Sequence, residues 1–349
     1  MKSFVRVTLA AALAAAGFAQ AQNIPLPPAL TVPPAQSFPN ADHERVAYHL
    51  NRARIIAGSD MYPAFQRRCV MSQIYSQYAN SAEAALQIHP QKVFDNLYFV
   101  GQGAVTAWAV KTSAGIVLID SLNNPSEAEH ILMAGVRKLG LDPADVKYVI
   151  VTHEHGDHYN GVRYLQDQYG VQAIASDLAW NAMDNGSATR PRRNITISDG
   201  QDYTIGDTTF HFMVTPGHTN GGVSIIMPVV DHGARHLAGI YSGWGIPGSP
   251  TGKATQLASV ARFAEATKRK GVDVLLANHQ TQDMSLYGLD LVKYRRTKAS
   301  IGHATPNHPG DFIDPHPYIV GKDGFQRFLQ VQAECIAVSA ARNGQVIPQ

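Results

Sequence analysis

The spacing of apolar residues changes at about residue 92, and this change divides the chain. Residues 41–58 repeat apolar side chains at helical spacing, whereas short apolar runs typical of strands follow residue 92. Between them, residues 59–90 have no clear period, and we expect an irregular segment. The predicted helices span 41–58, 124–140, 160–169, 176–184, 255–270 and 323–342. The predicted strands span 93–100, 105–110, 116–119, 148–151, 171–175, parts of 195–230, 237–241 and 272–277.

Strands and helices alternate in two similar halves, which predicts an α/β fold with four layers. We expect an αβ/βα sandwich, in which two mixed sheets pack face to face and helices cover both outer faces. The predicted domain organisation places this sandwich at 92–349 and an N-terminal extension at 41–91. Residues 22–40 carry six prolines and no periodic pattern, so we interpret them as an extended linker.

The first 21 residues have the three parts of a secretory signal peptide. Lys2 and Arg6 precede an apolar run at 7–18, and Ala-Gln-Ala at 19–21 provides small residues for cleavage. The run is too short to span a bilayer, and no later apolar segment is long enough. We therefore predict an exported protein, periplasmic or secreted, with no integral membrane segment.

Charge is balanced in the mature chain. Removing residues 1–21 takes away two basic residues and no acidic one, which leaves 27 of each kind. Basic clusters such as 190–193 are short and are interpreted as solvated surface, so nucleic acid is not an expected partner. A small-molecule substrate is expected instead, and the sequence assigns no oligomeric state.

The chain has only two cysteines, Cys69 in the N-terminal extension and Cys335 in the predicted last helix. In an oxidising compartment they could form one disulfide that ties the extension to the last helix. The alternative is two unrelated thiols. Neither cysteine lies in a histidine-rich segment, so neither is expected to bind metal.

Four potential metal ligands lie within the segment 152–158, Thr-His-Glu-His-Gly-Asp-His, directly after the apolar strand at 148–151. On a helix the three histidines would not share a face, whereas a tight loop turned by Gly156 lets the side chains converge. Imidazole and carboxylate ligands together suit zinc. Asp157 and His158 point differently from His153 and His155, which indicates half of each of two neighbouring metal sites.

Two later histidines, each at the end of a predicted strand, can complete these sites. His218 follows a Pro-Gly turn, and His279 follows the apolar strand at 272–277. The predicted ligand sets are His153, His155 and His218 for one zinc ion, and Asp157, His158 and His279 for the other. Asp157 is also the predicted catalytic residue, because its free oxygen could orient an attacking hydroxide.

These motifs resemble the metallo-β-lactamase superfamily, through H-x-H-x-D-H at 153–158, G-H-T at 217–219 and the strand-end His279. Within it, the chain is most similar to subclass B3 metallo-β-lactamases, whose zinc ligands are three histidines and Asp-His-His. Glyoxalase-type members carry a bridging aspartate on the strand at 239–244, and this chain has none there. Two serines help subclass B3 enzymes to hold the drug carboxylate. Only Ser242 matches one of them, and Trp244 stands about where the second would be.

The resemblance implies a zinc-dependent hydrolase that opens a β-lactam ring with a hydroxide shared by two zinc ions. Ser242, Trp244 and Tyr241 are the candidate substrate-binding residues, although the two aromatic residues could equally be core. Two alternatives stay open. One is a dinuclear zinc hydrolase of another ester, lactone or amide, and the other is a non-hydrolytic periplasmic metal-binding protein.

Overall fold

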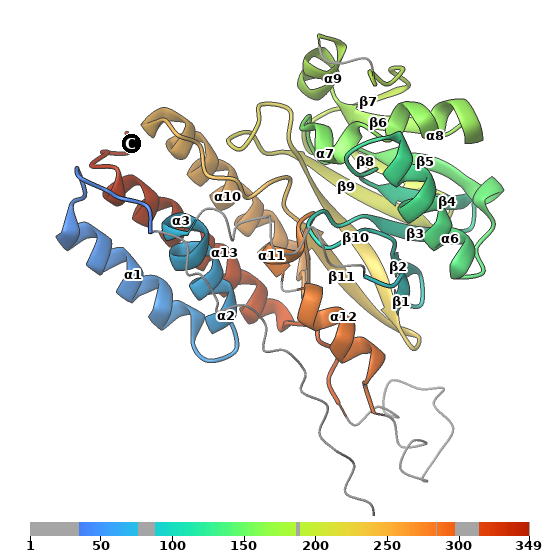
Figure 1. Ribbon diagram of the computed structural model, residues 1–349. Coiled ribbons are helices and arrows are strands. Elements are labelled where there is room, and N and C mark those ends of the chain that lie inside the picture. Colours follow the sequence, from blue (N-terminus) through green and yellow to red (C-terminus); the bar gives the residue numbers. More distant parts are fainter. Residues whose placement is uncertain (1–34, 76–87, 186–188, 284, 297–313, 349) are drawn as a thin grey trace, which may run out of the picture. The chain divides into compact units, whose positions relative to one another are not determined.

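The structure is a computed structural model that describes residues 35–75, 88–185, 189–283, 285–296 and 314–348. Its elements are shown in Figure 1. The predicted signal peptide at 1–21 and most of the predicted linker lie outside the described residues, so both stay predictions. None of the helices in the described ranges is both long enough and apolar enough to cross a membrane.

The larger sheet has seven strands in sequence order, from β1 to β7. Neighbours from β1 to β4 are antiparallel and those from β4 to β7 are parallel, so the sheet is mixed. The strands are β1 (Gln91–Phe94), β2 (Leu97–Phe99), β3 (Trp108–Thr112), β4 (Gly115–Ile119), β5 (Val146–Ile150), β6 (Gln172–Ser176) and β7 (Ile195–Ile197).

The smaller sheet has five strands in the order β12, β11, β10, β9 and β8. The β11–β12 pair is parallel and the other pairs are antiparallel. The strands are β8 (Asp202–Ile205), β9 (Thr208–Val214), β10 (Val223–Asp231), β11 (Ala234–Ile240) and β12 (Val274–Leu276).

Alternate residues of each strand belong to different cores, which fixes the layers. On β3 the side chains of Trp108 and Val110 join a core built from both sheets, while Ala109 joins the core on the outer face. On β9, Phe212 faces the shared core, and Met213 faces helices on the opposite side. Because side chains alternate across a strand, the shared core lies between two sheets packed face to face.

Helices cover both outer faces, so the predicted four-layer sandwich is confirmed (Figure 1). The helices over the larger sheet are α5 (Pro125–Glu127), α6 (Ala134–Lys138), α7 (Gly156–Tyr159), α8 (Val162–Tyr169) and α9 (Asp177–Asp184). A wider π-helical turn, η3 (Ala128–Met133), joins α5 to α6, and the short 3-10 turn η4 (Pro143–Asp145) precedes β5. The smaller sheet is covered by α10 (Pro250–Lys270) and α13 (Gly321–Arg342), while α11 (Gln280–Asp283) and α12 (Ser285–Lys293) follow β12.

The N-terminal extension packs against the last helix. Helix α1 (His43–Ala57) lies along α13, where the His49 ring and the Arg52 guanidinium both bind the Glu334 carboxylate. Cys69 and Cys335 form a disulfide, which decides between the two alternatives of the sequence analysis. The extension is thereby covalently joined to the helix layer over the smaller sheet.

Two stretches differ from the sequence prediction. The predicted irregular segment contains α2 (Tyr62–Phe65), the π-helical η1 (Gln66–Met71) and α3 (Ser72–Ile74), which are too short for a periodic pattern. Helix α10 begins five residues before the predicted start, because the Ser249 side chain caps it and Pro250 occupies its first turn. That first turn is polar, so no apolar period announced it.

Candidate metal centre

The first predicted triad meets where β5 and β9 end. His153 and His155 follow β5, and His218 comes from the loop between β9 and β10. The ring centres of His153 and His155 lie 4.8 and 4.6 Å from that of His218, and the ligand atoms of all three lie within 4.8 Å of one another. His153 is buried, whereas His155 is exposed, so this triad lies at the boundary with solvent.

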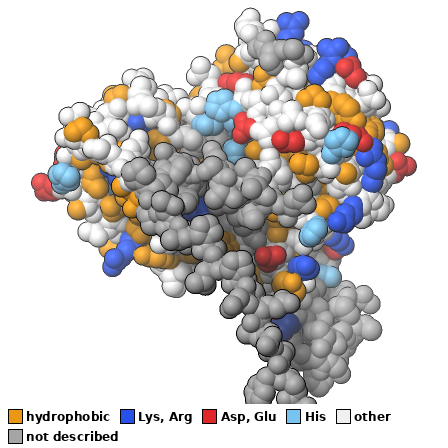
Figure 2. Space-filling view, in the orientation of Figure 1, with side chains coloured by type: hydrophobic (Ala, Val, Ile, Leu, Met, Phe, Trp, Pro, Cys, Tyr) orange, Lys and Arg blue, Asp and Glu red, His pale blue; other side chains and the backbone are white. Residues whose placement is uncertain are grey.

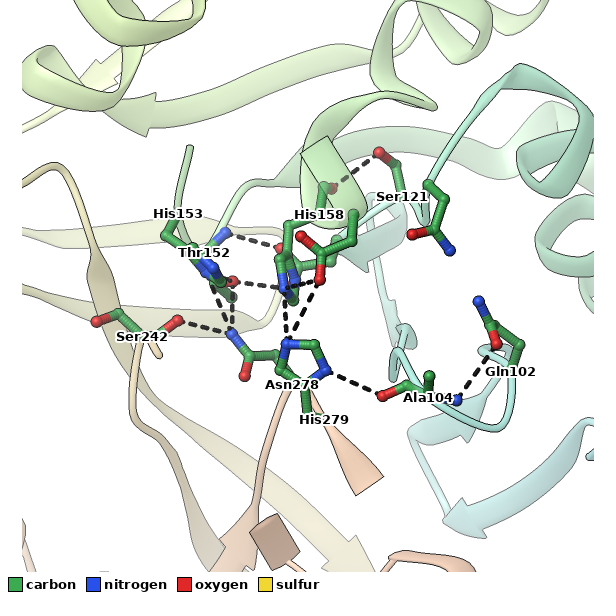
Figure 3. Close-up of polar contacts among 12 residues, drawn as sticks. Gln102, Ala104, Ser121, Thr152, His153, His158, Ser242, Asn278 and His279 are labelled. Carbon is green, nitrogen blue, oxygen red and sulfur yellow. Dashed lines mark hydrogen bonds and ion pairs between the residues drawn. The ribbon is translucent and has the colours of Figure 1, made fainter. Parts of the chain in front are cut away.

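The second predicted triad meets beside the first. His158 lies on α7, next to Asp157, and His279 follows β12. The Nε2 atoms of the two histidines are 3.1 Å apart, and they lie 3.2 and 3.5 Å from an Asp157 oxygen (Figure 3). The structure therefore brings together all six predicted ligands in the two predicted sets. The segment 152–158, which was predicted to be a loop, becomes helical at Gly156, where α7 begins.

Hydrogen bonds at Nδ1 fix the rings of the second triad. The Nδ1 atom of His158 lies 2.7 Å from an Asp120 carboxylate oxygen, and that of His279 lies 3.0 Å from the Ala104 carbonyl oxygen (Figure 3). Both partners only accept hydrogen bonds, so we assign the ring proton to Nδ1 in the neutral rings. The two Nε2 lone pairs then point at one place, together with the Asp157 carboxylate.

The His218 ring is held by the backbone after β11. Its Nδ1 lies 3.1 Å from the Gly245 carbonyl oxygen, which leaves Nε2 for a ligand. A Cβ atom at Gly243 or Gly245 would come within 2.3 or 2.2 Å of the ring. Only glycine leaves room for His218 at both positions.

A buried polar network lies directly beneath the triads. Asp120 accepts hydrogen bonds from both the backbone N–H and the hydroxyl of Thr152, at 2.8 Å each. Asn278 donates to the Thr152 hydroxyl at 2.9 Å and to the Ser242 carbonyl oxygen at 2.6 Å (Figure 3). This network joins the strand ends of both sheets, and it sets the positions from which His153, His158 and His279 project.

Glu154, the remaining side chain of the motif, is directed away from the ligand atoms. Its Oε1 accepts a hydrogen bond of 2.8 Å from the Gly221 backbone N–H. Gly221 lies in the same loop as His218, so Glu154 links the two loops that supply the first triad.

Sequence reasoning did not assign roles to Asp120 and Asn278. Asp120 precedes a predicted helix start and has a φ of 64°, a backbone conformation that is uncommon for residues other than glycine. Asn278 directly precedes His279. A polar residue next to a buried strand end was the only available signal for either side chain.

Burial and neighbouring charges shift the ring pKa values in opposite directions. Burial lowers the pKa of His153 well below its usual value, that of His218 to about 3 and that of His279 to about 4. Burial also disfavours the charged form of His158, but the carboxylates of Asp120 and Asp157 outweigh it and raise the pKa to about 10. Burial opposes ionisation of Asp157, but its hydrogen bond with His158 and that positive charge hold its pKa below the usual range.

The side chains of this centre fit zinc. Imidazole nitrogens and one carboxylate are ordinary zinc ligands, and each triad offers three of them. The Nε2 atom of buried His153 has no hydrogen-bond partner within the described part of the chain, which a metal ion would remedy. Zinc at the second triad would displace the His158 proton, because a ligating imidazole must be neutral on the ligating nitrogen.

A cavity of about 320 Å³ opens beside both triads. Its lining includes His218 and His279 from the two triads, and Gly245 and Ile246 from the segment after β11. The rest of its wall comes from the end of the predicted linker, from the N-terminal extension, from the end of α13 and from α11: Gln36, Phe38, Arg68, Ser72, Gln73, Gln282, Ser339 and Asn343. The extension therefore forms part of the cavity wall.

The three predicted substrate-binding residues do not line this cavity. Tyr241 and Trp244 stack on each other in the core between the smaller sheet and its helices, next to Phe263 and Phe328. Ser242 is buried and its hydroxyl bonds to Thr215. Tyr241 follows inward-facing Ile240, so strand alternation turns it towards the helices, and none of the three side chains lines the cavity.

Acidic, basic and histidine side chains are interspersed over one face of the molecule (Figure 2). Pale blue histidine side chains reach this surface beside red acidic ones. The visible charges form no broad area of a single sign among the described residues drawn there.

Comparisons with known proteins agree with this geometry. The metallo-beta-lactamase superfamily profile matches residues 100–231, which include the first loop and His218. A hydroxyacylglutathione hydrolase of Acidiphilium cryptum is 28% identical over 120 residues, 34% of this chain and 43% of that protein. The exodeoxyribonuclease WalJ of Streptococcus pneumoniae is 30% identical over 102 residues, 28% of this chain and 36% of that protein. The chain thus spans less than half of the length of these curated relatives.

Solved structures share the fold over a longer region. The subclass B3 metallo-β-lactamase of Bradyrhizobium japonicum is 22% identical, with a TM-score of 0.53 over 74% of this chain and 92% of that one. The native FEZ-1 metallo-β-lactamase of Legionella gormanii is 20% identical, with a TM-score of 0.57 over 71% of this chain and 93% of that one. The chain therefore resembles the metallo-β-lactamase superfamily over residues 100–231 and has the fold of subclass B3 metallo-β-lactamases.

Proposed function

We propose that the protein is an exported, zinc-dependent hydrolase that opens the ring of β-lactams. The observation that carries the proposal is the convergence of two three-residue ligand sets at the edge of one cavity. His153, His155 and His218 would hold one zinc ion, and Asp157, His158 and His279 would hold the other. Bound zinc would supply a Lewis acid for the substrate carbonyl and would make water reactive at neutral pH.

The side chains of the protein then have defined tasks. Asp157 stays ionised at neutral pH, so one oxygen can bind metal while the other accepts a hydrogen bond from the attacking water. Asp120 and the Ala104 carbonyl keep the rings of His158 and His279 in one orientation throughout the reaction. Among the described residues near the triads, no serine, cysteine or lysine has a basic partner placed to make it a nucleophile, so direct attack by water is the favoured chemistry.

Two features favour a β-lactam over the substrates named for the curated relatives. The fold extends over more than 90% of each of the two subclass B3 enzymes compared above, whereas the hydroxyacylglutathione hydrolase matches over less than half. The strand end at 239–244, where glyoxalase-type members carry a bridging aspartate, has no acidic residue in this chain. A second candidate, hydrolysis of a thioester, ester or lactone, rests on the similarity to the hydroxyacylglutathione hydrolase.

The test is hydrolysis of a substrate panel by the zinc-loaded chain from Gln22 onward. The panel contains nitrocefin, a carbapenem, an acyl lactone and an acyl thioester. We expect turnover of the β-lactams, loss of turnover after chelation and recovery when zinc is returned. Turnover of the lactone or thioester alone would replace the proposed substrate class. Zinc binding without turnover of any compound would support a metal-binding protein instead.

Export is part of the proposal and rests on the leader-like segment at 1–21. The disulfide between Cys69 and Cys335 is typical of an oxidising compartment and supports it. We expect the chain expressed in a bacterium to be recovered from the periplasmic fraction with Gln22 as its first residue. A full-length chain retained in the cytoplasm would contradict export.

A further inference from the structure

A buried arginine, which lies outside the histidine-rich motifs, lines the cavity beside the triads. Arg68 lies on η1 of the N-terminal extension, is 8% exposed and lines the cavity together with His218 and His279. Burying a guanidinium is costly unless its charge is compensated. The partners of Arg68 therefore decide whether it serves the fold alone.

Two of the three nitrogens of this guanidinium have neutral partners. Its Nε donates to the Gln332 side-chain oxygen at 3.1 Å, and its Nη2 donates to the Trp244 carbonyl oxygen. No described carboxylate lies within ion-pairing distance of Arg68, and no described residue accepts a hydrogen bond from its Nη1. The charge is thus positioned by the fold, and no carboxylate in the described part of the chain neutralises it.

The other residues that line the cavity do not neutralise this charge either. They include Gln36, Gln73 and Asn343, and none of the described residues lining the cavity is acidic. Burial lowers the pKa of Arg68 only to about 10, so the guanidinium remains charged at neutral pH. The positive charge of Arg68 is also one of the causes that lower the pKa of His279, which agrees with its position near the second triad.

We propose that Arg68 is a specificity residue that binds the carboxylate of an anionic substrate in the cavity beside the two triads. The inference rests on the proposed hydrolase function, and it adds that recognition of negative charge comes from the N-terminal extension. An Arg–carboxylate contact in a partly closed cavity is charge-assisted and directional, so it would also set how the substrate lies against the triads.

The experiment compares one β-lactam as its free acid with the same compound as its methyl ester, using the zinc-loaded chain. A charge-assisted hydrogen bond contributes about 1.5–3 kcal/mol, which corresponds to a change of roughly 10- to 150-fold. We expect Arg68→Gln to raise KM for the acid by about that factor, with a smaller effect on kcat, and to leave KM for the ester unchanged. Arg68→Lys should restore part of the preference for the acid.

The chain offers a matched control in Arg342, which is 5% exposed and has its pKa lowered to about 10 by burial. Its Nη1 donates to the Cys69 carbonyl oxygen and to Gln73, so it also holds the extension to α13, but it does not line the cavity. Arg342→Gln should therefore leave the preference for the acid unchanged. An equal rise of KM for acid and ester in Arg68→Gln, or a loss of the preference in both variants, would show a purely structural role.

Failure of the proposed reaction can be separated from failure of this inference. If the unmodified protein hydrolyses neither compound, binding of phenylacetate and of neutral phenylacetamide is measured by calorimetry instead. The inference then requires that phenylacetate bind more tightly than the amide, and that Arg68→Gln weaken only phenylacetate. Equal binding of phenylacetate to both proteins would overturn it.

Discussion

The two triads are held by different physical means. In the triad of His153, His155 and His218, the glycines after β11 give His218 its room, and no described residue hydrogen-bonds the ring of exposed His155. In the triad of Asp157, His158 and His279, the His158 ring is buried and the His279 ring is largely buried. The Nδ1 atom of each ring is fixed by an oxygen acceptor. Close packing around His218, with one Nδ1 hydrogen bond to Gly245, positions the first triad, whereas a buried carboxylate partner, Asp120, is found only at the second.

This difference predicts which changes each triad will tolerate. A steric change near His218 should damage the first triad and spare the second. A change of charge near His158 should do the reverse. The predictions below use this contrast, beginning with the largest expected effect.

Loss of Asp157 should be the most damaging change. Asp157→Ala removes the anionic ligand of the second triad and the acceptor proposed for the attacking water. Outer partners of metal ligands alone change affinity or activity by 10- to 100-fold, so we expect turnover to fall by more than about 100-fold. Zinc content, measured by mass spectrometry, should fall from two ions to one per chain. Unchanged turnover would show that the second triad has no part in the reaction.

A methyl group at Gly245 should damage the first triad by packing alone. The added Cβ of Gly245→Ala would lie 2.2 Å from the His218 ring, so the ring must move away from the other two ligands. We expect the bound zinc to fall from two ions to one and turnover to fall by at least about 10-fold. Gly248→Ala is the matched control, because a Cβ at Gly248 meets nothing within 4 Å. Equal zinc contents in these two variants would contradict the assigned packing role.

Asp120→Asn should weaken only the second triad. Asparagine keeps the size of the side chain and tolerates the positive φ of this position, so the backbone should be preserved. The His158 ring, however, loses the carboxylate that fixes its Nδ1 proton. We expect the zinc affinity of the second triad to fall about 10- to 100-fold, with that of the first unchanged. Competition with a chelator of known affinity measures both, and equal losses at the two triads would contradict the contrast.

Acid should destabilise the metal-free protein. The pKa values of His153, His218 and His279 are lowered by burial, so the unfolded chain binds protons that the folded chain does not, and stability falls as pH falls from 6.5 towards 4. The raised pKa of His158 acts in a different window, because its contribution is lost only as pH rises from 6.5 towards 10. The free energy of unfolding by urea should be lower at pH 4 than at pH 6.5 by on the order of 3 kcal/mol for each of these three rings. Equal stability at both pH values would show that these rings are not buried in the neutral form.

The six candidate ligands could be predicted from the sequence because each lies shortly after the end of a buried strand. His218 and His279 could be assigned because apolar runs and a Pro-Gly turn precede them, and strand ends of packed sheets meet at one edge. The contacts beneath them could not be predicted in this way. Asp120 and Thr152 are separated by a helix and a strand, and their hydrogen bonds depend on how β4 and β5 pair.

The sequence did not predict the positions of apolar residues on a strand that is buried on both faces. Tyr241 and Trp244 follow a strand whose two faces are both buried, so their apolar character did not reveal which face they join. Arg68 lies among helices that are too short to show a period, and its place at the cavity depends on packing against the distant α13. The candidate metal ligands could therefore be predicted from local patterns, whereas the residues that line the cavity could not.

The most direct test of the central claim is anomalous diffraction at the zinc edge from crystals of the zinc-loaded protein. We predict two peaks, one among His153, His155 and His218 and the other among Asp157, His158 and His279. A single peak, or two peaks away from these side chains, would contradict the dinuclear centre.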